Sequence, residues 1–200
     1  MTKLKIAIAK GNTKMGDNMP SISLPPGTTC SEIACKTCLK SCYIMKAWRM
    51  YKATRAAYKR NLKIWKTAPE EYMQQVREYL KKKKPRFFRW HVGGDIPDQY
   101  YLDWMLSIAA NFHKTKFLVF TKKYELDYSK SRFVKNLAVV FSAWPGVSID
   151  RMKGVPIAWM QDGTETRVPE GALECHGGCS TCGMCWNLPK LGKDVFFNKH

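Results

Sequence analysis

The sequence of 200 residues is poor in negative charge and in histidine, and it has no long apolar run. Its 16 acidic residues face 34 basic ones, which gives a net charge of +18. No stretch approaches the roughly 20 apolar residues that a membrane-spanning helix needs. The apolar run at residues 6–9 is also too short for the core of a secretory signal. We therefore expect a soluble, cytoplasmic protein with no membrane partner.

Familiar catalytic motifs are missing as well. The sequence contains no Ser–His–Asp arrangement, no Gly-rich phosphate-binding loop and no HExxH motif. Four histidines are too few for a histidine-rich metal site. There is no internal repeat and no low-complexity linker. The length suits a single domain over residues 1–200, with a core large enough to fold without disulfides.

The positive charge is concentrated in residues 36–86, which contain 16 basic and 3 acidic residues. From about Leu39 to Lys66, apolar residues recur at helical spacing and basic residues occupy the other side. The expected apolar stripe consists of Tyr43, Ala47, Tyr51, Tyr58, Leu62 and Trp65. A second helix is expected from Pro69 to about Lys83. We expect this basic helical segment, residues 39–84, to attract DNA or RNA; a merely solvated surface is the alternative.

Strand and helix patterns alternate in the rest of the chain. Strands are expected at residues 4–9, 86–92, 116–121, 137–144 and 156–161. Helices are expected at residues 97–112 and 125–136. This alternation predicts an α/β fold with a short, mostly parallel sheet and crossover helices.

The eight cysteines form two groups. The first cysteine segment, residues 30–42, has the spacing C-x4-C-x2-C-x3-C and contains Cys30, Cys35, Cys38 and Cys42. The second cysteine segment, residues 175–185, has the spacing C-x3-C-x2-C-x2-C and contains Cys175, Cys179, Cys182 and Cys185. In a cytoplasmic protein, such groups more often bind metal or do redox chemistry than pair as disulfides. All eight cysteines are therefore candidate metal ligands, and the N- and C-terminal cysteine-rich loops are expected to hold metal clusters.

The spacing bears on which metal these thiols would bind. Structural zinc sites usually join two ligand pairs across a longer loop, and neither segment has such a loop. Three or four cysteines at short spacing can all bind one [4Fe–4S] cluster, so one or two such clusters are expected, with zinc as the alternative. Disulfides are a further alternative. Cys30 stands four residues clear of its neighbour, and for this thiol a buried apolar role is the alternative.

Ligands of parallel sheets bind beyond the carboxyl ends of the strands. The candidate cofactor-binding residues at these ends are Gly93, Gly94, Asp95 and Ser142. The candidate catalytic residues are His91, Asp95 and Lys122. Each has a plainer alternative: Asp95 or Asp98 as a helix cap, His91 as a structural side chain, and Lys122 as a solvated charge.

Two family resemblances follow from these motifs. A cysteine segment followed by Tyr43, and then a strand running into GGDIP, resembles the opening of radical-SAM enzymes. In that family a C-x3-C-x2-C loop holds a [4Fe–4S] cluster and a GGEP-type loop contacts S-adenosylmethionine. The resemblance implies an abbreviated partial barrel, S-adenosylmethionine as a cofactor and, if the protein is an enzyme, iron–sulfur oxidoreductase chemistry. Two departures weaken it: the first segment has the reverse spacing, and Asp95 replaces glutamate.

The sequence also resembles, over most of its length, the phage "gene product 88" family. The similar stretches are GNTKMG…SISLPPG, C-x2-C-x3-CYIMKA, FFRWHVGGDIPDQYYLDWM, KFLVFTKKYE, LAVVFSAWPG and CHGGC-x2-C-x2-CW. This resemblance implies a phage or mobile-element context, a location in the host cytoplasm, and cluster binding by all the cysteines except Cys30. It implies no known reaction.

Three functional hypotheses remain open. The first is an iron–sulfur protein, with or without enzymatic activity. The second is a nucleic-acid-binding module that bound metal stabilises. The third is an electron carrier, which needs a redox partner.

Overall fold

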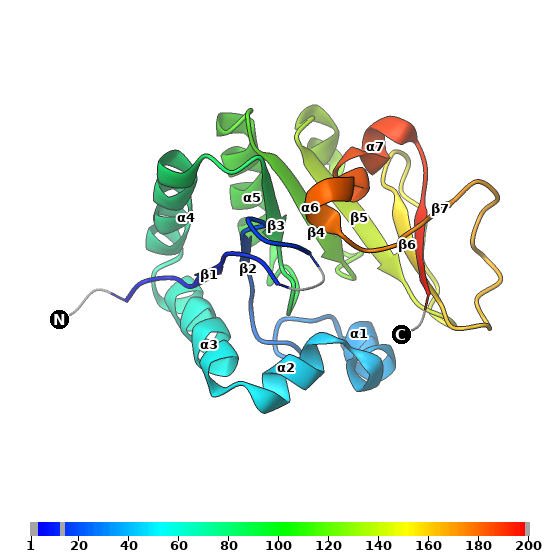
Figure 1. Ribbon diagram of the computed structural model, residues 1–200, viewed down its shortest axis with the longest axis horizontal. Helices are drawn as coiled ribbons and strands as arrows, with labels where there is room; N and C mark the ends of the chain where they lie inside the picture. Colours follow the sequence, from blue (N-terminus) through cyan, green and yellow to red (C-terminus); the bar gives the residue numbers. More distant parts are fainter. Residues whose placement is uncertain (1–3, 13–14, 199–200) are drawn as a thin grey trace.

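The computed structural model describes residues 4–12 and 15–198, which build an eight-stranded sheet flanked by helices (Figure 1). The strands are β1 (Ile8–Ala9), β2 (Ser21–Ile22), β3 (Phe87–Trp90), β4 (Lys116–Thr121), β5 (Leu137–Ala143), β6 (Ile157–Gln161), β7 (Leu173–Glu174) and β8 (Val195–Asn198). Their order is β1-β2-β3-β4-β5-β6-β8-β7. Only β1 and β2 pair antiparallel within the described residues; every other neighbouring pair is parallel. The predicted mixed α/β fold with a mostly parallel sheet is confirmed.

The helices confirm some predicted boundaries. The α-helices are α1 (Glu32–Thr37), α2 (Ile44–Met50), α3 (Lys52–Thr67), α4 (Pro69–Lys83), α5 (Gln99–Asn111), α6 (Cys179–Cys182) and α7 (Leu188–Leu191). The 3-10 helices are η1 (Leu39–Ser41), η2 (Ser129–Phe133) and η3 (Met184–Asn187). Helix α4 has both predicted ends, because proline at its start, glutamates in its first turn and lysines in its last turn all favour those limits. Within the described chain, every helix is too short or too polar to span a bilayer.

The prediction of one continuous helix from Leu39 to Lys66 is wrong. The chain breaks between η1 and α2, and again at Tyr51, whose backbone is extended with φ −106° and ψ 107°. The Arg55 guanidinium stabilises the end of α2 at the second break. Its Nη1 donates to the carbonyl oxygens of Trp48 (2.8 Å) and Arg49 (2.7 Å), which would otherwise lack partners at a helix end. As a result Tyr51 is 56% exposed and does not belong to the core. Of the predicted apolar stripe, Leu62 and Trp65 are buried, whereas Ala47 and Tyr58 are only partly buried.

Two other predicted elements are shorter than expected. The predicted strand at residues 4–9 is reduced to β1, because the backbone of Ala7 bonds to a side chain of α3: Asn61 Oδ1 accepts from its N–H and Asn61 Nδ2 donates to its carbonyl. The predicted helix at residues 125–136 is reduced to η2. There the buried Tyr128 hydroxyl donates to the Lys123 carbonyl at 2.8 Å, and this contact fixes the segment as a loop.

The two faces of the sheet have different covers. Phe88 and Trp90 point toward α3, α4 and α5, whereas Phe87 points the other way, toward η3 and α7. Parallel strands in sequential order carry their crossover helices on one face, which leaves the other face to other segments. In Figure 1, α5 lies behind the sheet and α6 in front of it. The second cysteine segment therefore forms part of the cover of the second face, which we call the cysteine face.

Candidate metal centre

The end of the first cysteine segment reaches the second segment on the cysteine face, although the two are far apart in sequence. Cys42 of the first segment belongs to the same apolar cluster as Cys175, Cys179 and Cys185 of the second. Tyr43 follows Cys42. It is 49% exposed overall, but its hydroxyl points inward and donates to the Val92 carbonyl at 2.6 Å. Burial raises the pKa of Tyr43, and the neighbouring Cys42 and Cys179 contribute to the rise. Cys42 therefore links the two segments, whereas Cys30 and Cys38 lie nearer the strand ends, with Asp95 as a neighbour of both.

All eight cysteines lie within the described residues, and all are free thiols. Cys38 and Cys185 are buried, Cys182 is exposed, and the others are partly buried. In residues 4–12 and 15–198, no group of three or more His, Cys, Asp or Glu side chains is arranged to hold a metal ion. Metal binding by these cysteines therefore stays a prediction.

The electrostatics of both segments combine burial with a nearby cation. Burial raises the pKa of the Cys30 thiol to about 12, and burial likewise raises that of Cys185 to about 12. Burial also raises the pKa of Cys38. Opposing these effects, Lys122 lowers the pKa of Cys38 and Arg89 lowers that of Cys185. Each segment therefore has one basic side chain that favours its thiolates.

Arg89 projects from β3 into the cysteine face. Its Nη1 donates to Met15 Sδ at 3.5 Å, and its guanidinium carbon lies 5.0 Å from the centre of the Phe120 ring. Its Nε is buried without a hydrogen-bond partner, and no carboxylate of the described residues forms an ion pair with it. The side chain is only partly buried, but a buried N–H without an acceptor and a cation without a counter-charge both favour an anionic neighbour. Among the described residues, the cysteine face therefore has no carboxylate that balances the charge of Arg89.

The strand ends bring three predicted site residues together. The buried carboxylate of Asp95 accepts from the Lys122 backbone N–H at 2.8 Å, and Lys122 Nζ donates to Ser142 Oγ at 2.9 Å. Burial raises the pKa of Asp95, against the effect of the Lys122 N–H. Asp98, not Asp95, caps α5, because its carboxylate accepts from the Tyr101 N–H at 2.8 Å. Asp95, Lys122 and Ser142 thus form one chain of contacts across β3, β4 and β5.

The two glycines of the GGDIP loop pack against the protein itself. Gly93 accepts from the Leu24 N–H at 3.0 Å. Gly94 has φ +75°, and a Cβ there would lie 2.6 Å from the Leu24 carbonyl oxygen and from Thr29 Oγ1. Thr29 Oγ1 also accepts from the Asp95 N–H at 3.0 Å. The close approach that glycine permits is therefore made to the loop between β2 and α1, and cofactor binding by these residues stays a prediction.

His91 lies apart from that chain of contacts, in an aromatic environment. It is 3% exposed, its φ is +59°, and its ring lies 5.3 Å from Tyr101 and 6.2 Å from Trp90. Neither ring nitrogen has a hydrogen-bond partner among the described residues. Burial lowers the pKa of His91 to about 3, and Arg89 adds to the effect. The imidazole is therefore neutral, and its catalytic role stays untested.

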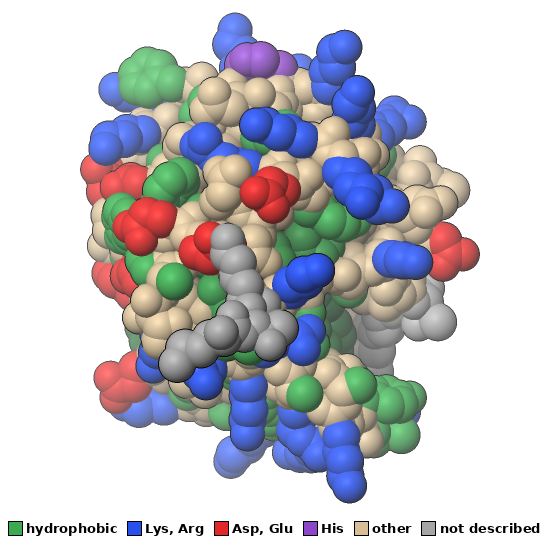
Figure 2. Space-filling model, turned by 90° about the vertical axis from the view of Figure 1, so that its left-hand side faces the viewer, with side chains coloured by type: hydrophobic (Ala, Val, Ile, Leu, Met, Phe, Trp, Pro, Cys, Tyr) green, Lys and Arg blue, Asp and Glu red, His purple; other side chains and the backbone are tan. Residues whose placement is uncertain are grey.

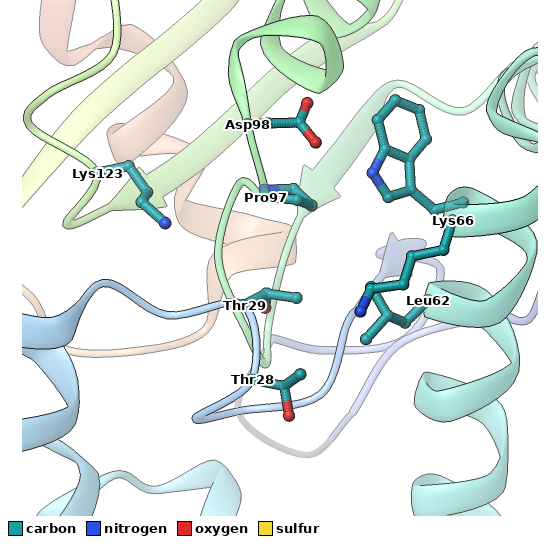
Figure 3. A pocket seen from close by; sticks show the side chains of 8 residues that line it. Thr28, Thr29, Leu62, Lys66, Pro97, Asp98 and Lys123 are labelled. Atoms are coloured by element: carbon teal, nitrogen blue, oxygen red, sulfur yellow. The ribbon is translucent and has the colours of Figure 1, made fainter.

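A cavity of about 250 Å³ opens at the carboxyl ends of β2, β3 and β4 (Figure 3). Its lining residues come from four segments: Thr28, Thr29, Leu62, Trp65, Lys66, Pro97, Asp98 and Lys123. In Figure 3 the side chains of Lys66 and Lys123 reach toward it from opposite sides. The sequence pattern does not reveal this cavity, because Lys66 resembles the other exposed lysines on the basic side of the helix. The one feature of the sequence that points to the cavity is the position of Lys123 just after the end of a strand.

Comparison with known proteins agrees with the second resemblance. The family described as "Gene product 88" matches residues 3–188. The "Gene 88 protein" of Mycobacterium phage D29 is 27% identical over 91% of this chain and 89% of its own length. No solved structure matches. The chain therefore belongs to the phage Gene product 88 family.

Proposed function

We propose that the protein is an iron–sulfur protein whose cysteine segments bind one or two [4Fe–4S] clusters beside the cysteine face. Cys175, Cys179, Cys182 and Cys185 would hold one cluster. The thiols of the first segment would hold the other. Bound clusters would supply one-electron redox chemistry.

The unpaired Arg89 carries this proposal. A cluster bound by thiolates brings negative charge, and the thiols that would bind it include Cys179 and Cys185. Burial raises the pKa of both thiols, and the nearby Arg89 opposes that rise. Cluster binding would therefore supply the counter-charge that this guanidinium lacks. The helices that carry these thiols are short, with six residues in α1, three in η1 and four in α6, so few backbone hydrogen bonds hold each segment in place. Soft thiolates also suit zinc, which remains the alternative metal.

The cavity at the strand ends supports an enzymatic role for the first segment. Thr28 and Thr29 line the cavity and directly precede Cys30. Cys30 Sγ accepts from the Gly27 N–H at 3.3 Å, a contact it keeps as a free thiol. With Cys30 free, Cys35, Cys38 and Cys42 would leave one iron open to a ligand. S-adenosylmethionine is the cofactor that the radical-SAM resemblance suggests, with Lys66 or Lys123 on its carboxylate.

The test is the iron, sulfide and zinc content of protein purified without oxygen. We expect brown protein with about four irons and four sulfides per cluster. Cys185→Ser should lose one cluster, whereas Cys30→Ser should keep both. Arg89→Met should lower the iron content, while Arg86→Met, which changes an exposed arginine beside β3, should not. Colourless or zinc-loaded protein would contradict the proposal, and calorimetry of the anaerobic protein tests binding of S-adenosylmethionine.

A second candidate function is nucleic-acid contact through the basic helical segment. Figure 2 shows lysine and arginine side chains over the side of the molecule that carries α3 and α4, with some acidic side chains among them. The exposed basic residues of this segment include Lys46, Arg49, Lys52, Lys59, Lys63, Lys66 and Lys81 to Lys84. Binding should fall steeply with salt, and the salt slope should drop by about 0.9 for each phosphate contact removed. No binding at low salt would exclude this function.

A further inference from the structure

A second cleft lies at the opposite edge of the sheet from the GGDIP loop. It has a volume of about 400 Å³ and lies where β4 and β5 begin. Its walls come from the end of α5, from the start of β4, from the loop before β5, and from η3 and α7. None of the residues singled out as site candidates lines it.

The cleft is strongly basic. Its lining includes Lys116, Lys135, Lys190 and His113, and no acidic residue of the described chain. Lys116 is partly buried, and its Nζ donates to Asn187 Oδ1 at 2.9 Å, so its position is fixed. None of the three lysines forms an ion pair with a described carboxylate. Cations that converge on one cavity without a counter-charge favour an anionic ligand such as a phosphate.

An exposed aromatic ring lies beside these cations. Phe133 lines the cleft, and 72% of its surface is exposed, which is high for a large apolar side chain. The Arg132 guanidinium carbon lies 4.7 Å from the centre of its ring. Aromatic rings combined with lysines and arginines are the means by which proteins bind unpaired bases together with their phosphates.

We propose that this cleft binds a nucleotide, with its phosphate at Lys116, Lys135 and Lys190 and its base stacked on Phe133. The ligand is either a free nucleotide or one unit of a single strand, because a base in a duplex is not free to stack. None of its lining residues belongs to the basic helical segment or is one of the eight cysteines, but η3 also contains Cys185, so every variant is compared at the same metal content.

The experiment measures binding by protein of known metal content at low salt. The probes are thymidine monophosphate, a fluorescent oligothymidylate and a duplex of the same length. The double variant Lys135→Gln/Lys190→Gln should weaken binding roughly tenfold or more. Phe133→Ala should also weaken it roughly tenfold. The control Lys10→Gln/Lys153→Gln removes two exposed lysines that lie outside both the cleft and the basic helical segment, and it should change binding in the cleft less than about twofold.

The outcomes separate the alternatives. Binding of the monophosphate alone identifies a free nucleotide, and binding of the oligothymidylate identifies a single strand; both support the site if the cleft variants weaken them. Equal losses in both double variants would overturn the proposal, since general charge attraction would then explain binding. So would a duplex affinity equal to that of the single strand, or no binding to any probe. Circular dichroism of each variant confirms that it is folded.

Discussion

Acidification from pH 7 to pH 5.5 should destabilise the protein through His91. Its imidazole is buried without a hydrogen-bond partner among the described residues, and its pKa is about 3 in the folded protein, against about 6.5 when unfolded. Between these values the unfolded chain binds a proton that the folded chain does not. The stability present above pH 6.5 is therefore lost as the pH falls toward 3. At pH 5.5 the loss relative to pH 7 is about 1.2 kcal/mol.

Urea unfolding at the two pH values measures this loss, with His91→Asn as the comparison. Asparagine tolerates the left-handed backbone at φ +59° and does not titrate. The contributions of all groups that the two proteins share cancel in the difference between the two pH dependences. The parent should lose about 1.2 kcal/mol more than the variant. Equal pH dependence would refute the reasoning, because the ring would then have a partner or access to solvent.

Two further changes test the packing around the strand ends. In urea unfolding, Gly94→Ala should lower the free energy of unfolding by about 1 to 3 kcal/mol more than Gly146→Ala does. Both glycines have φ near +75°, but only at Gly94 would the added Cβ collide with backbone atoms. Equal losses in the two variants would contradict this. Asp194→Ala should cost about 3 kcal/mol or more and lower the melting temperature, because this buried carboxylate accepts from Trp159 Nε1 and two other donors. The exposed Asp150→Ala should change little, and an equally small effect at Asp194 would show that its contacts contribute little to stability.

The helices show which features of the fold are visible in the sequence. Helix α4 was predictable at both ends, because proline, glutamate and lysine at its ends act locally on its own turns. The break at Tyr51 was not, since it depends on the Arg55 side chain reaching back to two carbonyls of the preceding helix. Apolar spacing continues across that break, so periodicity alone could not reveal it.

In the candidate site, too, some residues were predictable from the sequence and one was not. Asp95, Lys122 and Ser142 were predicted to share one edge, because the carboxyl ends of neighbouring parallel strands meet there. Arg89 was missed. Its place on β3, between Phe88 and Trp90, indicates the opposite face, but its lack of a partner depends on which residues the distant C-terminal segment places there. No local sequence pattern can show that a side chain will lack a partner in the folded protein.

The strand order links the proposed cluster to the fold itself. Sequential parallel strands leave the cysteine face to be covered by α2, η3 and α7, and Cys185 and Trp186 are buried in that cover. Substitution of Cys185 therefore disturbs the cover as well as any cluster, and iron loss in that variant has two explanations. Arg89 does not share this ambiguity, because its charge has no ion-pair partner among the described residues. Methionine at this position keeps an apolar stem of similar length and removes the charge that a cluster would neutralise, together with the weak contacts to Met15 Sδ and the Phe120 ring. Arg89→Met therefore separates metal binding from folding more cleanly than Cys185→Ser does.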